Sequence, residues 1–164
     1  MKNKITVADL IMGAGGLITF IFSFLAFYKY GDTSINAWDD QGAAFASTLP
    51  AILGLVMAVW IALEMAGVSL PEEVLTYNRA QLKGTWGIAA GGIMLSWLST
   101  DPDKGAGFWL MLIGSLAMAV GAVMALLGKG TEVVNIGSSS GAPTSASPST
   151  PAESITPPPP PPAP

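Results

Sequence analysis

The stretch that decides the fold is QGAAFASTLPAILGLVMAVWIAL, residues 41 to 63, which contains no charged side chain over 23 positions. A helix rises about 1.5 Å per residue, so roughly 20 apolar residues cross the ~30 Å hydrocarbon layer of a bilayer. This run is therefore long enough to span a membrane. We expect a transmembrane helix over residues 43 to 66.

Three more uncharged runs lie on either side of this stretch. They contain 19 residues after Asp9, 17 after Lys83 and 24 after Lys104. Because a helix satisfies its own backbone hydrogen bonds in lipid, each run predicts a further spanning helix, over residues 8 to 28, 85 to 100 and 108 to 128. The run after Lys83 is the shortest, and the span expected within it, residues 85 to 100, contains three glycines, so a re-entrant or interfacial hairpin is its alternative. The predicted fold is an all-α transmembrane four-helix bundle over residues 1 to 128.

The composition excludes most familiar chemistry. Only 11% of the 164 residues are charged, and the chain contains no cysteine and no histidine. Disulfides, Cys/His zinc sites, iron–sulfur clusters and Ser-His-Asp triads are therefore ruled out. Gly13 to Gly16 imitate a phosphate-binding loop but lie inside an apolar helix. We predict a protein that is not an enzyme, with no cofactor, no metal site and no nucleic-acid partner.

Positive charges favour one orientation in the membrane. Cytoplasmic connections usually carry the excess of Lys and Arg. With both termini in the cytoplasm, only Lys29 and Lys104 lie outside, whereas the inside holds Lys2, Lys4, Arg79, Lys83 and Lys129. The prediction is a multi-pass plasma-membrane protein with both termini cytoplasmic.

The connection between the second and third spans contains a helix-start signal. Ser69 and Glu72 have the S-x-x-E spacing of a capping box, with Pro71 in the first turn, where a missing N–H costs little. We expect a short helix from Ser69 to about Leu82, lying on the cytoplasmic surface.

The composition changes after Lys129. Residues 129 to 164 hold ten of the thirteen prolines and many serines, which predicts a disordered cytoplasmic tail. A proline run near its end favours the polyproline II conformation that aromatic grooves bind. The candidate docking residues are Pro157, Pro158, Pro159, Pro160, Pro161 and Pro162. A simple spacer is the alternative.

Two carboxylates touch the predicted spans. Glu64 lies near the cytoplasmic end of the second span, and Asp9 lies at the start of the first. Ionisable groups in lipid are candidate proton or ion sites, but both positions are within about a turn of the interface. Glu64 is the one candidate intramembrane ionisable site, and a structural role is its alternative.

Small residues recur on every span and predict close helix packing. The second span has Gly54, Ala58, Ala62 and Ala66 at intervals of four, and the fourth has Gly114, Gly121 and Gly128 at intervals of seven. A compact bundle in the lipid bilayer follows, and a homodimer through a surplus small-residue stripe is a further possibility.

Three phrases carry a family resemblance. They are Ser23 to Tyr28 (SFLAFY), Asn36 to Trp38 (NAW) and Gly107 to Leu110 (GFWL). Together with residues 8 to 128 they resemble small four-span actinobacterial integral membrane proteins of unknown function that carry a variable Pro/Ser-rich hydrophilic segment. The resemblance implies four spans in a Gram-positive plasma membrane and aromatic interface anchors. It implies no activity.

These features favour a membrane anchor or interaction scaffold that binds a protein partner through its proline-rich tail. One alternative is a small transporter or channel-like protein that uses the bundle interior, with Glu64 as its ionisable site. The other is an accessory subunit of a larger membrane complex.

Overall fold

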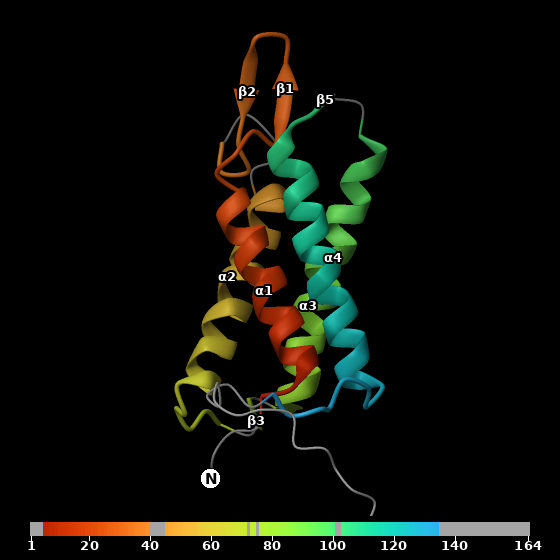
Figure 1. Cartoon of the computed structure of the whole chain (residues 1–164). Helices are drawn as coiled ribbons and strands as arrows, with labels where there is room; N and C mark the ends of the chain where they lie inside the picture. Colours follow the sequence, from red (N-terminus) through yellow and green to blue (C-terminus); the bar gives the residue numbers. More distant parts are fainter. Residues whose placement is uncertain (1–4, 40–44, 72, 75, 101–102, 135–164) are drawn as a thin grey trace, which may run out of the picture.

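The computed structural model describes residues 5–39, 45–71, 73–74, 76–100 and 103–134. Four long helices dominate it and lie side by side (Figure 1). Each helix contacts its two neighbours in a ring, so α1 and α3 are diagonal partners, as are α2 and α4. The helices are α1 (Val7–Phe22), α2 (Phe45–Met65), α3 (Arg79–Ser96) and α4 (Ala106–Leu126).

Two helices begin at reciprocal capping boxes. Thr6 caps α1 and exchanges hydrogen bonds with Asp9, and Asn78 caps α3 through the same exchange with Gln81. Each box satisfies backbone donors that the first turn leaves without intrahelical partners. The third helix therefore begins at Arg79, six positions before the expected residue 85.

The prediction of a helix that starts at Ser69 is wrong. In its place a short antiparallel hairpin joins β3 (Glu73–Val74) to β4 (Tyr77–Asn78). Asn78 must be extended to serve as the cap of α3, and a helix running through it to Leu82 would remove that cap. The N-cap that starts the helix is Asn78, nine residues after Ser69, the N-cap that the sequence suggested.

The opposite end of the bundle carries a small antiparallel sheet that the sequence did not predict. Its strands are β1 (Tyr28–Tyr30), β2 (Thr33–Ile35) and β5 (Asp103–Lys104), in the order β2-β1-β5. Gly31, at the tip of the β1–β2 hairpin, has a φ of 59°, a conformation that glycine adopts without strain. Two strands of this sheet come from the connection between α1 and α2, and the third comes from the connection between α3 and α4. The first strand begins at Tyr28, so α1 ends before it, at Phe22, and not at the expected residue 28. A 3-10 turn, η1 (Trp97–Ser99), follows α3.

Glycine allows the helices to approach closely. A Cβ atom built on Gly16 would lie 2.5 Å from the carbonyl oxygen of Gly54, and one on Gly54 would lie 2.7 Å from that of Gly16. Gly15 and Gly114 are related in the same way across α1 and α4, at 2.6 and 2.7 Å. These backbones touch without intervening side chains, as expected for helices that associate in lipid.

The small-residue stripe of α2 is only partly a packing face. Gly54 is buried, but Ala62 and Ala66 are exposed. A helix has 3.6 residues per turn, so positions four apart drift around its axis. The buried row instead alternates steps of three and four, through Gly54, Met57, Ile61 and Glu64. On α4, Gly114 and Gly121 are buried as expected, whereas Gly128 is exposed.

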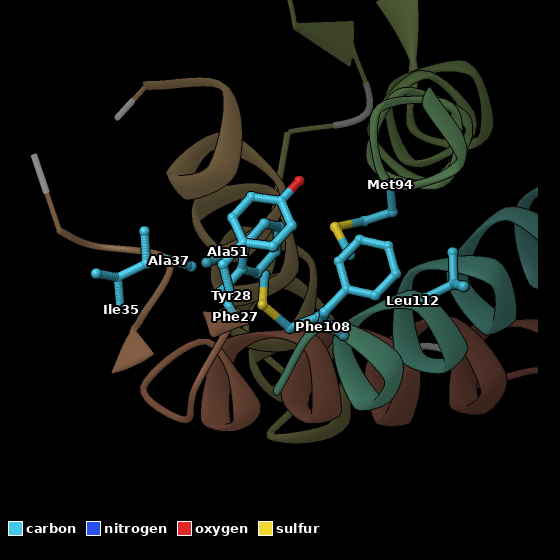
Figure 2. Close-up of a cluster of buried hydrophobic side chains, with 9 residues drawn as sticks. Phe27, Tyr28, Ile35, Ala37, Ala51, Met94, Phe108 and Leu112 are labelled. Atoms are coloured by element: carbon cyan, nitrogen blue, oxygen red, sulfur yellow. The ribbon is translucent and has the colours of Figure 1, made fainter. Parts of the chain in front are cut away.

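Two apolar clusters fill the bundle. The cluster near the β-sheet combines the rings of Phe27, Tyr28 and Phe108 with Met94 (Figure 2). The cluster near the other end is built mainly from small residues and methionines, among them Met12, Met57 and Met118. Phe27 and Tyr28 are only 1% and 3% exposed, so these two aromatics form core, although the family resemblance implied that their phrase provides interface anchors.

The surface between the two ends is apolar. Large side chains such as Ile113, Val120 and Leu17 are half exposed, at 59%, 55% and 50%, while glycine, alanine and serine lie inside. Helices α2 and α4 are each long and apolar enough to cross a membrane, and α1 is apolar but shorter, with 16 residues. Large apolar residues therefore lie on the surface as well as in the core, and an apolar surface of this extent is unusual for a soluble bundle.

The chain after α4 turns back onto the start of α1. Gly128 and Gly130 both have positive φ angles, 66° and 68°. The N–H of Val7 donates to the carbonyl of Glu132, and the N–H of Val134 donates to that of Ile5. Residues 129 to 134, assigned to the tail by sequence, are thus attached to the bundle. The rest of the predicted tail lies outside the described residues.

Candidate functional site

Glu64, the carboxylate singled out by sequence, lies in the last turn of α2 and is 6% exposed. Its Oε2 accepts a hydrogen bond from Lys83 Nζ at 3.2 Å. Its Oε1 accepts one from Trp60 Nε1 at 2.9 Å, one turn earlier on the same helix. Both oxygens of the carboxylate therefore have a donor within the protein.

Lys83 also binds a second carboxylate. Its Nζ lies 2.5 Å from Asp9 Oδ1, and the two side chains are about 10% exposed. The other oxygen of Asp9 accepts hydrogen bonds from the backbone N–H and the hydroxyl of Thr6, at 3.0 and 2.7 Å. The capping box of α1 therefore holds Asp9 in place for Lys83.

Asp9, Glu64 and Lys83 form what we call the ion cluster. It joins α1, α2 and α3 near the end of the bundle where the chain begins, and the Asp9–Lys83 contact crosses the diagonal between α1 and α3. Trp60 packs edge-on against Trp86, with ring centroids 5.6 Å apart, and Trp86 packs against the apolar cluster that contains Met12, Met57 and Met118. A single lysine thus connects helices that are otherwise not neighbours.

A buried charge is costly unless it is paired and hydrogen-bonded. In the ion cluster every carboxylate oxygen has a donor, and within the described part of the chain no buried side-chain nitrogen or oxygen lacks a partner. This arrangement suits a fixed structural element. It leaves neither carboxylate as an isolated group of the kind that a proton or ion site would offer.

The sequence reasoning missed Lys83 because it counted this residue as part of a cytoplasmic loop. One signal could have found it. Lys83, Gly87 and Gly91 lie at intervals of four, and all three are buried on α3. A lysine in register with a glycine packing face points into the bundle, so it requires a carboxylate partner there.

The three phrases of the family resemblance meet at the other end of the bundle. Trp38 Nε1 donates to Ser23 Oγ at 2.8 Å, and the N–H of Ala37 donates to the Ser23 carbonyl at 3.1 Å. From α4, the N–H of Gly107 donates to the carbonyl of Ala26 at 2.9 Å. These phrases tie together the end of α1, the connection after it and the start of α4, which is a packing role.

The structure adds no metal-ligating or docking residues within its described ranges. Among residues 5–39, 45–71, 73–74, 76–100 and 103–134, no group of three acidic side chains could hold a metal ion. The proline run from Pro157 to Pro162 lies outside these ranges, so its docking role stays a prediction.

Comparison with known proteins adds no assignment. No protein-family model, no curated protein sequence and no solved structure matches the chain.

Proposed function

We propose that the chain is a plasma-membrane anchor whose four helices all span the bilayer and hold a proline-rich cytoplasmic segment as an interaction scaffold. The apolar side chains exposed around the bundle support this placement, because lipid is the solvent that accepts them. Arg79, Lys83 and Lys129 gather at one end and Lys29 and Lys104 at the other. That asymmetry supports a cytoplasmic location for the termini.

Helices α1 and α3 need their neighbours to span. The 16 residues of α1 rise about 24 Å, a little less than the hydrocarbon layer. Two features favour its insertion despite this length: α1 packs lengthwise against α2 and α4, and in the ion cluster Lys83 offsets one of the two carboxylate charges near the interface. Both features support insertion of all four helices as one unit.

The observation that carries the scaffold proposal is the attachment of residues 130 to 134 to the start of α1. Without it, the chain after α4 would leave the membrane from the end of that helix alone. With it, the following segment starts at a defined point beside residues 5 to 8. A segment anchored in this way is presented from one fixed position on the cytoplasmic surface.

The test is chemical crosslinking in native membranes, which needs no probe in the tail. Two variants are compared with the wild type: a chain ending at Val134, and a full-length chain with serine in place of residues 157 to 162. Under the scaffold proposal both variants lose the same crosslinked partner while the bundle keeps its melting temperature. If the serine variant retains that partner, the proline run is only a spacer.

A small transporter is the second candidate, and one observation favours it. Two carboxylates, Asp9 and Glu64, share one lysine near the membrane interface, and such groups mark ion and proton pathways in many transporters. The close glycine contacts between α1, α2 and α4 leave little room for a passage, so we rank this function second. Glu64→Gln in proteoliposomes would suppress flux if it is correct.

A further inference from the structure

A pocket of about 210 Å³ opens beside the ion cluster. Its walls come from four places: the cap of α1, the first turns of α3, the last turn of α4 and the returning segment after α4. Among its lining residues are three cations, Arg79, Lys83 and Lys129, and two hydroxyl side chains, Thr6 and Thr131. It therefore exists only because residues 129 to 131 fold back over the bundle end.

The charge of this pocket suits an anion. Asp9 is the one carboxylate among its lining residues, and Lys83 and Thr6 already occupy both oxygens of Asp9. Because Lys83 is shared with Glu64, the ion cluster keeps one net negative charge, and Arg79 and Lys129 together exceed it. The first turn of α3 adds the positive end of a helix dipole, because Arg79 and Ala80 are its first residues.

The two excess cations differ in how they are held. The Nε and Nη2 atoms of Arg79 donate to the carbonyl oxygens of Pro71 and Leu70, which fixes the guanidinium beside the pocket and leaves its Nη1 donors for an anion. Lys129 is exposed, so its long side chain is able to reach an anion from the returning segment. A fixed arginine on α3 and an adjustable lysine after α4 are well suited to phosphate oxygens.

The surroundings of the pocket indicate where the anion comes from. Leu126 and Leu127, the residues just before the returning segment, are 48% and 66% exposed. An apolar surface therefore lies directly beside the cations, as a headgroup and its acyl chains would require. Basic pockets at the cytoplasmic ends of membrane helices bind anionic lipid headgroups.

We propose that this pocket binds a phosphate-bearing anion through Arg79 and Lys129, with Thr6 and Thr131 as hydroxyl donors. This inference rests on the membrane placement proposed above. In that placement the phosphate of an anionic phospholipid is at the right depth, and a soluble phosphate is the other source of the same chemistry.

The experiment measures binding to the purified full-length protein by native mass spectrometry from detergent. One arm titrates a phosphatidylglycerol, a second titrates a phosphatidylcholine of the same chain length, and a third titrates inorganic phosphate. The variants are Lys129→Gln, Arg79→Gln and the double variant. Lys29→Gln, an exposed lysine at the opposite end, is the charge-matched control.

We expect Lys129→Gln to raise the dissociation constant for the anionic lipid about 10-fold and the double variant to raise it further, since each charged hydrogen bond to phosphate is lost. Lys29→Gln should leave it unchanged. Binding of inorganic phosphate with the same dependence on Lys129 would support the pocket and assign it to a soluble anion.

The inference would be overturned if Lys129→Gln and Arg79→Gln bound the anionic lipid as tightly as the wild type. It would also be overturned if the protein bound both lipids equally and did not bind inorganic phosphate. Because Lys129 lies outside the ion cluster, its variant tests the pocket without unfolding the bundle. The scaffold proposal is tested through the tail, so failure of one leaves the other standing.

Discussion

At the scale of single residues, Lys83 determines whether the end of the bundle holds together. It is the shared partner of Asp9 and Glu64, which come from different helices. Removing a shared partner leaves two buried carboxylates without a cation, which costs far more than the net contribution of an intact pair. The lysine is therefore more important for stability than either acid.

The first prediction follows from this asymmetry. Lys83→Met should lower the free energy of unfolding by about 3–5 kcal/mol, measured by thermal or denaturant unfolding in detergent at pH 7. Glu64→Gln should cost less, because Lys83 keeps Asp9 and the glutamine oxygen still accepts from Trp60. Lys29→Gln serves as the control for loss of a surface charge.

A triple variant separates charge from shape. Adding Asp9→Asn and Glu64→Gln to Lys83→Met should recover part of the lost stability, because no uncompensated charge then remains. If the triple variant is less stable than Lys83→Met alone, the ion cluster acts through hydrogen-bond geometry and not through charge neutralisation.

Tyr28 supplies a second prediction at this scale. Its hydroxyl lies 2.7 Å from Thr100 Oγ1. The Thr100 hydroxyl donates its proton to the Trp97 carbonyl, so Tyr28 is the donor between them. Burial raises the pKa of Tyr28 above its ordinary value of 10.0. The folded state thus holds this proton more tightly than the unfolded chain does.

The sign of the pH dependence follows. The contribution of Tyr28 is complete below about pH 10, the unfolded pKa, and is lost as the pH rises toward the higher folded pKa. Tyr28→Phe should lose about 1 kcal/mol at pH 7 and should show a smaller further loss between pH 9 and 11. Tyr77→Phe, at an exposed tyrosine, is the control, and an equal alkaline loss in all three proteins would contradict the argument.

At the scale of elements, the glycine contacts set the distances between helices. Gly16 and Gly54 approach backbone to backbone, and neither has room for a methyl group. Gly92 on α3 has nothing within 4 Å of an added Cβ, although it also lies in a helix. These two kinds of glycine give opposite expectations for the same substitution.

Gly16→Ala should therefore destabilise the bundle by about 1–3 kcal/mol through overpacking, whereas Gly92→Ala should be neutral or stabilising by up to about 1 kcal/mol, because alanine favours the helix. Unfolding in detergent measures both. Equal effects of the two substitutions would show that α1 and α2 separate easily, contrary to the packing described here.

The sequence predicted the positions of the helices, which depend on uncharged runs alone, but it did not predict the start of α3, where two capping signals compete. The charge-free runs located the four helices, since each of them lies largely within one such run. The start of α3 was missed because the S-x-x-E signal at Ser69 comes nine residues before the capping box at Asn78, and the extended backbone of Asn78 starts the helix at the second one. The ion cluster was missed for the same reason, since Lys83 counted as a loop residue until α3 was seen to begin at Arg79.

The strands were not predictable from local pattern. β1 pairs with β5 through Tyr28 with Lys104 and Lys29 with Asp103, residues that are 76 and 74 positions apart along the chain. Such short strands exist only because the helices bring the two connections together. The same holds for residues 130 to 134, whose partner is the start of the chain.

At the scale of the whole molecule, the bundle has two different ends. One carries the β-sheet, with Lys29 and Lys104, and the other carries the ion cluster, the returning segment and the pocket. The scaffold and anion-site proposals both rest on the proposed membrane placement and its orientation. A direct test must report the side of the membrane for every connection.

Single-cysteine labelling provides this test, because the natural chain has no cysteine and the background is clean. Asp32→Cys and Ser99→Cys lie at the sheet end, and Thr76→Cys and Thr131→Cys lie at the other. A membrane-impermeant maleimide should label the first pair in intact cells and the second pair only after permeabilisation. Labelling of Ser99→Cys and Thr76→Cys from the same side would contradict four spans, and recovery of the unlabelled protein from the soluble fraction without detergent would contradict membrane insertion altogether.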